Sequence, residues 1–172
     1  MTRVKVLRRV AADLNALVEA GVLANWALCG ALALAVWGAP RATLDIDALA
    51  DPAKEHKAAE VAQALVRRGW ILIEHARHHD DPVPELLRMT YGGVGVDLLI
   101  AHRVWEAAML ADAATVPWQG VVIPSVRVEA LAAMKLRAGG PQDLVDAGRL
   151  QELPGFDQER FVSWKKKLRL RG

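Results

Sequence analysis

Three aspartates interrupt segments of the sequence that otherwise have the pattern of buried β-strands. Asp45 and Asp47 lie in "TLDIDALA", and Asp97 lies in "VGVDLLI". Desolvating an unpaired carboxylate is costly, so buried charges persist where they are paired or bind a metal. Side chains two residues apart in a strand project from the same face, which puts Asp45, Asp47 and Thr43 together and Leu44 on the opposite face. Carboxylates held this close favour a shared divalent cation, and hard oxygen ligands suit Mg²⁺.

A glycine upstream supplies a second component of the same chemistry. Gly30 follows the apolar segment "WALC" and precedes "ALALAVW", where a strand is expected to pass into a helix. A glycine at such a junction lets backbone N–H groups at the helix start approach an anion closely. A phosphate cradle followed by a pair of aspartates provides what phosphoryl transfer requires.

The spacing of apolar residues along the chain predicts the helices and strands that position these aspartates and Gly30. Apolar residues at helical spacing predict helices over about 4–18, 31–37, 58–66, 103–112, 126–138 and 157–170, and a further helix that begins at Pro141. Strands are expected at "WALC", "TLDIDALA", "WILIEHA", "ELLRMTY" and "VGVDLLI", with a hairpin around Gly92 and Gly93 and a further strand or small hairpin in "VPWQGVVIPS". This order predicts one α+β domain over residues 1–172, with a mixed β-sheet flanked by helices at about 22–125 and a helical C-terminal part at about 126–172.

The composition excludes several other classes of protein. The formal net charge is only +2, which gives no general case for nucleic-acid binding, although basic residues gather near the C-terminus. Cys29 is the single cysteine, so no internal disulfide can form, and we expect a packed core thiol. The longest uncharged apolar run covers residues 26–40, which is shorter than the ~20 residues of a membrane-spanning helix. A cytoplasmic protein without membrane association is expected.

The motifs together resemble the nucleotidyltransferase superfamily related to DNA polymerase beta. Within that superfamily, "CGALALAVWGAPRATLDIDALA" is most similar to the AbiEii-like toxin group of small bacterial nucleotidyltransferases, and "LAAMKLRAGGPQDLVDAGRL" resembles the later helical motif of that group. The similarity covers roughly residues 25–150. Two positions depart from the pattern. Ala31 stands where a second glycine or a serine is usual, and Gln142 replaces a common arginine.

The resemblance implies a nucleotidyltransferase fold and a set of site residues. Asp45, Asp47 and Asp97 would hold two Mg²⁺ ions, or Mn²⁺, and act in catalysis. Gly30 and Ala31 would form the phosphate turn for a nucleoside triphosphate donor. Arg41, Thr43 and Lys135 would lie on the nucleotide side of the site, and Asp143 and Asp146 would follow on the next helix.

The implied reaction is transfer of a nucleoside monophosphate from the triphosphate to a hydroxyl acceptor. The acceptor would be RNA such as tRNA, or a protein, and the chain would be the toxin of a toxin–antitoxin pair with a cognate antitoxin as partner. Two alternatives stay open. The chain could be an antibiotic nucleotidyltransferase of the aminoglycoside type, or a binding module that kept the fold and lost turnover.

Some of these residues also have purely structural interpretations. "TLDID" could be an edge strand with a solvated acidic face. Arg41 could be a turn residue after Pro40, and Lys135 an exposed helical lysine. The segment "EHARHHDD" contains His75, His78, His79, Asp80 and Asp81, but it lacks the separated cysteine ligands of a structural zinc site, so a solvated loop is expected there.

Overall fold

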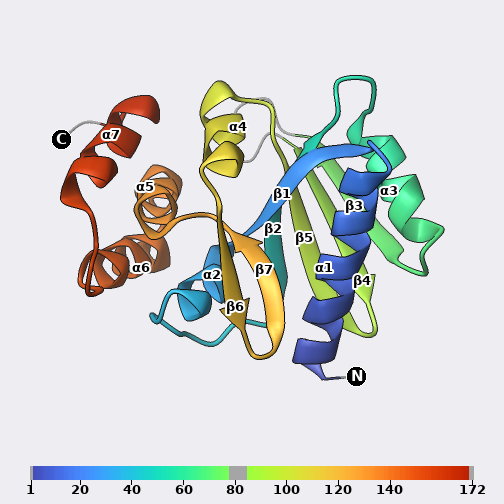
Figure 1. Ribbon diagram of the computed structural model, residues 1–172, viewed down its shortest axis with the longest axis horizontal. Coiled ribbons are helices and arrows are strands. Elements are labelled where there is room, and N and C mark those ends of the chain that lie inside the picture. Colours follow the sequence, from blue (N-terminus) through green and yellow to red (C-terminus); the bar gives the residue numbers. More distant parts are fainter. Residues whose placement is uncertain (1, 78–84, 171–172) are drawn as a thin grey trace.

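A computed structural model describes residues 2–77 and 85–170, and within them the strands form one mixed sheet (Figure 1). The strand order is β3-β4-β5-β2-β1-β7-β6. The pairs β2–β5 and β1–β7 are parallel, and the other neighbouring pairs are antiparallel. The strands are β1 (Leu23–Cys29), β2 (Ile46–Pro52), β3 (Ile71–Arg77), β4 (Glu85–Tyr91), β5 (Val94–Ile100), β6 (Ala114–Trp118) and β7 (Val121–Ser125). The predicted α+β class with a mixed sheet is confirmed.

Helices flank the sheet and make up the C-terminal part. They are α1 (Arg3–Glu19), α2 (Gly30–Val36), α3 (Ala58–Val66), α4 (Val104–Ala111), α5 (Val128–Ala138), α6 (Pro141–Gln151) and α7 (Gln158–Lys167). Helix α1 lies across the sheet and contacts β1 and α3, whereas α2 and α4 contact β1 and β2 (Figure 1). Helix α5 packs on α6 and α7, and these three form a group beside the sheet.

The helix bounds follow from the apolar period and from the glycines that end it. The face of α1 that carries Leu7, Leu14 and Leu17 is buried, as its spacing predicts. Helix α5 ends at Gly139, whose φ of 71° is left-handed and therefore favours glycine. Pro141 then begins α6, where its missing N–H has no helical partner to lose. The turn between α5 and α6 is therefore short, and it holds the two helices side by side.

The two central strands bury one face completely. Ile46 and Ala48 on β2, and Val96 and Leu98 on β5, are each 0% exposed. Asp47 and Asp97 alternate with them and therefore project from the opposite face. The aspartates are thus not on a solvated edge strand, because β2 and β5 occupy the middle of the sheet.

One predicted strand boundary is wrong. The alternating pattern extends back to Thr43, but β2 begins at Ile46, and Leu44 is 81% exposed instead of facing the core. The hydroxyl of Thr43 donates a 3.2 Å hydrogen bond to the backbone carbonyl of Asp45. Such a local side-chain-to-backbone bond competes with strand pairing, so the chain bends before it enters the sheet.

None of the helices in the described ranges has both the length and the apolar composition needed to cross a membrane.

Candidate active site

A row of polar side chains crosses one face of the sheet at a single level. Asp47 on β2 is in register with Asp97 on β5, and Asp97 is in register with Arg88 on β4. The row continues to Glu74 on β3 and, on the other side, to Cys29 on β1. Because paired residues on neighbouring strands project from the same face, the β2–β5 pairing alone brings Asp47 and Asp97 together.

Two glycines make space for two of the aspartates. A Cβ atom at Gly30 would overlap the Asp47 carboxylate, and Gly30 also has a left-handed φ of 62°. A Cβ atom at Gly95 would overlap the carboxylate of Asp45, which precedes β2. Gly30 therefore serves two purposes, because it turns the chain from β1 into α2 and leaves room for a carboxylate.

Asp47 is held in an environment that opposes its ionisation. Burial raises the pKa of Asp47 from 3.8 to about 6, and the negative charges of Asp97 and Asp45 add to this effect. Lys135 and a hydrogen bond from the backbone N–H of Ala31 act in the opposite direction without cancelling it. The Ala31 N–H predicted to face a phosphate therefore contacts the Asp47 carboxylate in this structure.

Asp97 is paired with Arg88, an arginine to which the sequence pattern gave no role. Arg88 donates from Nε to Asp97 Oδ1 at 3.2 Å and from Nη2 to Oδ2 at 3.4 Å. Its Nη1 also reaches Glu74 Oε2 at 3.2 Å. The Asp97 side chain is only 18% exposed, and the Arg88 guanidinium satisfies its carboxylate.

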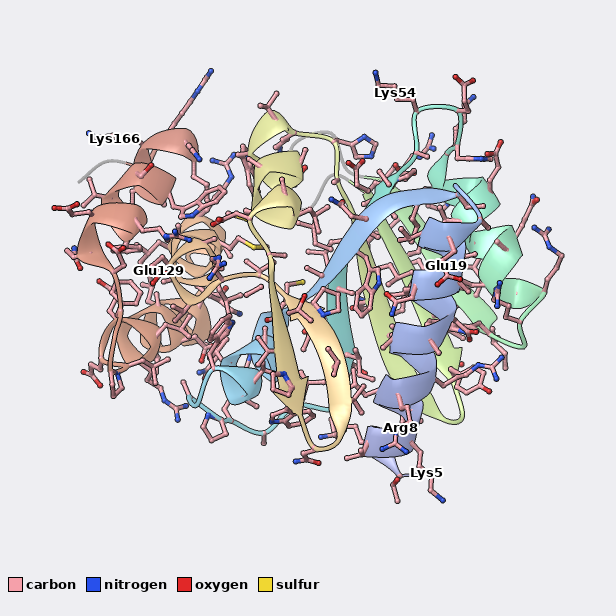
Figure 2. All side chains as sticks on the ribbon, in the orientation of Figure 1. Lys5, Arg8, Glu19, Lys54, Glu129 and Lys166 are labelled. Atoms are coloured by element: carbon pink, nitrogen blue, oxygen red, sulfur yellow. The ribbon has the colours of Figure 1, made fainter. Side chains whose placement is uncertain are left out.

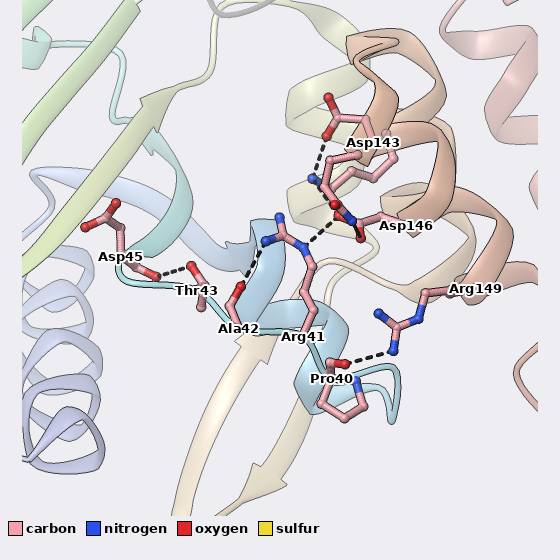
Figure 3. Close-up of polar contacts among 10 residues, drawn as sticks. Pro40, Arg41, Ala42, Thr43, Asp45, Asp143, Asp146 and Arg149 are labelled. Atoms are coloured by element: carbon pink, nitrogen blue, oxygen red, sulfur yellow. Dashed lines mark hydrogen bonds and ion pairs between the residues drawn. The ribbon is translucent and has the colours of Figure 1, made fainter.

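A second polar cluster joins the segment before β2 to the C-terminal helices (Figure 3). Asp146 on α6 is fully buried, and it accepts from Arg41 Nε at 3.0 Å and from Gln142 Nε2 at 2.9 Å. Lys135 on α5 lies between the two late aspartates, 2.8 Å from Asp143 Oδ1 and 3.4 Å from Asp146 Oδ2. Lys135 is thus not an exposed helical lysine, since its side chain is 13% exposed and bridges two carboxylates.

The cluster around Asp146 is separate from Asp45. The carboxylate of Asp45 points away from Arg41 and Asp146, and only the backbone of Asp45 is held by Thr43 (Figure 3). Arg41 donates further to the carbonyl of Ala42 at 3.1 Å. Arg41 is therefore more than a turn residue, because it links the β2 entrance to α6 across the structure.

A pocket of about 220 Å³ lies between the acidic face of the sheet and helices α4 and α5. Four of the residues singled out from the sequence line it, namely Gly30, Asp47, Lys135 and Asp143. Apolar side chains such as Leu131 and Met134 form much of the rest. The predicted residues Ala31, Arg41, Thr43, Asp45 and Asp97 are not part of its lining. The pocket therefore brings together four of the predicted residues, and those five lie outside its lining.

Three further residues belong to this region, although sequence reasoning gave them no role. Arg88 pairs with Asp97, while Trp105 and Arg137 line the pocket. Cys29 also lines it, and burial raises the pKa of its thiol well above the ordinary value. A thiol held protonated in this way agrees with the expected core role and is a poor nucleophile.

As they stand, no three His, Cys, Asp or Glu side chains in the described ranges are grouped closely enough to hold a metal ion. The predicted histidine loop gives no further test, because His78, His79, Asp80 and Asp81 lie outside the described residues. His75 is described, and its Nε2 lies 2.6 Å from Glu85 Oε1.

Comparison with known proteins gives a fold and no family assignment. No protein-family model matches the chain, and no curated protein matches it. Solved structures do match over nearly the whole length. The antibiotic-resistance factor ANT(2″)-Ia aligns with a TM-score of 0.60 and 15% identity, over 96% of this chain and 92% of that one. The same factor in complex with adenylyl-2″-tobramycin aligns with a TM-score of 0.59 and 16% identity, over 95% and 97%.

A proposed nucleotidyltransferase from Thermotoga maritima aligns with a TM-score of 0.55 and 18% identity, over 97% of this chain and 96% of that one. These likenesses show that the chain has a nucleotidyltransferase fold, as the sequence predicted. At such low identity they show the fold alone, and the predicted AbiEii-like group stays a prediction.

Proposed function

We propose that this protein is a metal-dependent nucleotidyltransferase that moves a nucleoside monophosphate from a nucleoside triphosphate to a hydroxyl acceptor. The observation that carries the proposal is the pairing of Asp47 with Asp97 on adjacent parallel strands, beside Gly30 and Lys135, in a nucleotidyltransferase fold. Asp47 lines the pocket and Asp97 and Asp45 raise its pKa, so their negative charges have an electrostatic cost that bound cations would reduce.

The residues present fit a divalent cation in their chemistry. Asp45, Asp47 and Asp97 offer only hard carboxylate oxygens, which suit Mg²⁺ or Mn²⁺. The raised pKa of Asp47 reports a negative charge that the protein's own cations leave incompletely compensated. Asp97 also accepts from Arg88, whose positive charge competes with a cation for the same carboxylate. When bound, two such ions would lower the pKa of the acceptor hydroxyl and stabilise charge on the leaving oxygens.

Each residue of the candidate site then has a defined role. Asp97 accepts the proton of the acceptor hydroxyl, a role that the resemblance to nucleotidyltransferases gives to the aspartate at this position. Gly30 and Ala31 place backbone N–H groups at the start of α2, where they can meet phosphate oxygens once the Ala31 N–H leaves the Asp47 carboxylate. Arg41 and Lys135 offset the charge of the triphosphate, and Asp146 holds both in position. Thr43 fixes the backbone at Asp45.

The acceptor that we propose first is RNA such as tRNA, or a protein, in the setting of a toxin with a cognate antitoxin. The second candidate is an antibiotic acceptor, and the observation in its favour is the likeness to ANT(2″)-Ia over most of both chains. The third is a binding module without turnover, for which Ala31 and Gln142 would be the signs. Gln142 still donates to Asp146, so the substitution keeps a contact at that position.

A labelling experiment tests the proposal. The protein is incubated with each α-labelled ribonucleoside triphosphate, Mg²⁺ or Mn²⁺, and either cellular RNA, cellular protein or tobramycin. Asp47→Asn is the inactive variant, and Asp51→Asn, the same substitution on the same strand outside the acidic row, is the matched control. We expect wild type and Asp51→Asn to label RNA or protein at similar rates. The rate of labelling by Asp47→Asn should be lower by more than about tenfold.

The other outcomes separate the candidates. Label on tobramycin alone would favour the antibiotic enzyme. Label on none of the acceptors, together with a melting temperature raised by a triphosphate, would favour the inactive binding module, because a ligand of the native state must stabilise it.

A further inference from the structure

A second pocket, of about 490 Å³, lies between α4, α5 and the end of α7. Among the described residues its lining contains four basic side chains and no acidic one, namely Arg103, Arg137, Lys167 and Arg169, together with Trp105, Val104, Ala108 and Leu168. Arg103 is paired with Glu106 at 3.3 Å, so the positive charge of the pocket rests mainly on Arg137, Lys167 and Arg169. Neighbouring cations repel one another, so a pocket of this composition is suited to an anionic ligand. The overall charge of +2 does not reveal it, since these residues come from three separate elements.

This basic pocket adjoins the candidate active site. Trp105 and Arg137 line both pockets, so the two cavities share a wall. A ligand in the basic pocket would therefore reach toward the space in front of Asp47 and Lys135. While a triphosphate occupies the turn at Gly30, the acceptor has to approach the active site from a neighbouring position such as the basic pocket.

The side chains in the pocket are held in place before any ligand binds. Arg103 and Arg137 both lie over the ring of Trp105, at 5.5 and 5.4 Å from its centroid. Arg137 also donates from Nη1 to the carbonyl of Leu168 at 2.9 Å, which ties α5 to the end of α7. Its buried Nε has no hydrogen-bond partner among the described residues. A buried donor without a partner is costly, and an anionic oxygen would satisfy it.

From this geometry we propose that the basic pocket holds the phosphates of a single-stranded RNA end, and so presents a terminal hydroxyl to the active site. The inference rests on the proposed nucleotidyltransferase function, whose acceptor it specifies. Lysine and arginine contact phosphates without regard to sequence, and unstacked bases pack on guanidinium planes. The pocket offers both kinds of contact, because Arg103 and Arg137 lie over the ring of Trp105. A polycationic acceptor such as an aminoglycoside would be repelled by the same side chains.

Binding of RNA can be measured without turnover. A fluorescein-labelled single-stranded RNA of about 12 nucleotides is titrated with the protein at about 0.1 M salt, with EDTA and without triphosphate, and anisotropy is recorded. The test variant is Lys167→Glu with Arg169→Glu. The control is Lys166→Glu with Lys165→Glu, which makes the same change of charge on the same helix, at positions that do not line the pocket. Lys166 lies on the outer side of α7 (Figure 2).

We expect the test variant to bind RNA at least about tenfold more weakly than wild type and the control to lose less than about threefold, since only pocket cations contact the bound phosphates. A second variant, Trp105→Phe, keeps an aromatic ring with less surface for stacking, and we expect an intermediate loss of about threefold. Circular dichroism and urea unfolding confirm that each variant is folded.

Two results would overturn the inference. One is an equal loss of RNA affinity in the test and control variants, which would indicate that RNA is attracted to the positive charge of α7 in general. The other is no measurable binding of RNA by the folded wild-type protein. Because the titration contains neither metal nor triphosphate, failure of nucleotide transfer would leave the binding result unchanged. Conversely, labelling of protein or tobramycin by a chain that does not bind RNA would keep the proposed function and reject this acceptor.

Discussion

Replacing Asp47 with asparagine should stabilise the metal-free protein at neutral and alkaline pH. Asparagine has nearly the same shape as aspartate and can still accept the hydrogen bond from the Ala31 N–H, but it carries no charge. The ionised Asp47 is disfavoured by burial and by Asp97 and Asp45. The substitution therefore removes an unfavourable charge while it keeps the packing beside Gly30.

The magnitude follows from the pKa of Asp47. The folded protein holds this proton with a pKa of about 6, against an ordinary value of 3.8. At about 1.4 kcal/mol for each unit of pKa, ionised Asp47 lowers the free energy of unfolding by about 3 kcal/mol above pH 7. A raised carboxyl pKa means that the native state binds the proton more tightly than the unfolded chain. This contribution to stability is consequently full below about pH 4 and is lost as the pH rises through 6.

Urea unfolding in EDTA at several pH values measures this effect. We expect Asp47→Asn to exceed wild type by up to about 3 kcal/mol at pH 8 and to match it near pH 4. Asp51→Asn is the comparison, because burial also raises the pKa of Asp51, but neither Asp97 nor Asp45 contributes to that shift. It should gain stability in the same direction as Asp47→Asn and should keep any response to Mg²⁺. Added Mg²⁺ should then stabilise wild type and leave Asp47→Asn unchanged. A variant less stable than wild type at pH 8, or a difference that does not change with pH, would refute the electrostatic reasoning.

Three further substitutions test other parts of the site. Gly30→Ala should abolish transfer and lower the free energy of unfolding by more than about 2 kcal/mol, because it adds a Cβ at a left-handed φ and against the Asp47 carboxylate. Asp146→Ala should cost about 3–5 kcal/mol in urea unfolding, since it leaves two cations without their buried partner. Arg88→Gln should tighten Mg²⁺ binding in calorimetry by about three- to tenfold, because it frees Asp97 from a competing charge.

A matched control accompanies each of these variants. Gly21→Ala introduces the same strain at a φ of 72° with nothing within 4 Å of the new Cβ, so it isolates the overlap at Gly30. Asp143→Ala removes the more exposed partner of Lys135 and should cost less than Asp146→Ala. Arg77→Gln removes an arginine that pairs with Glu85 on the neighbouring strand, and it should leave Mg²⁺ affinity unchanged.

Mg²⁺ binding that weakens in Arg88→Gln would mean that the arginine orients Asp97 for the metal instead of competing with it.

The order of elements could be predicted from the sequence because each one carries its own local signal. Helix α1 has a regular apolar face that ends near Gly21, and "VGVDLLI" is short, β-branched and bounded by the Gly92–Gly93 turn. The strand positions of Asp47 and Asp97 could be predicted as well, since a charged residue within an apolar strand pattern is easily recognised. These signals depend on residues close together in the chain, and tertiary packing did not override them.

Contacts between distant segments had no comparable signal. Arg41 and Asp146 are 105 positions apart, and nothing in either segment shows that α6 packs beside the entrance to β2. The basic pocket is a similar case, because its cations come from α4, α5 and the end of α7. The start of β2 was misplaced for a different reason. The alternating pattern continues to Thr43, whereas the chain bends where the Thr43 hydroxyl bonds to the Asp45 carbonyl.

Arg88 differs from these cases, because its place followed from a feature that the sequence did predict. A two-residue turn at Gly92 and Gly93 pairs Tyr91 with Val94, and counting outward along the two strands places Arg88 directly opposite Asp97. An arginine beside a candidate metal ligand is an electrostatic competitor for that ligand as long as no cation is bound. A divalent cation held by Asp97 would compensate the charge of that carboxylate, and Arg88, which also contacts Glu74, would then be available to face an incoming phosphate. The hairpin register therefore places a positive charge on β4 beside the candidate metal ligand on β5.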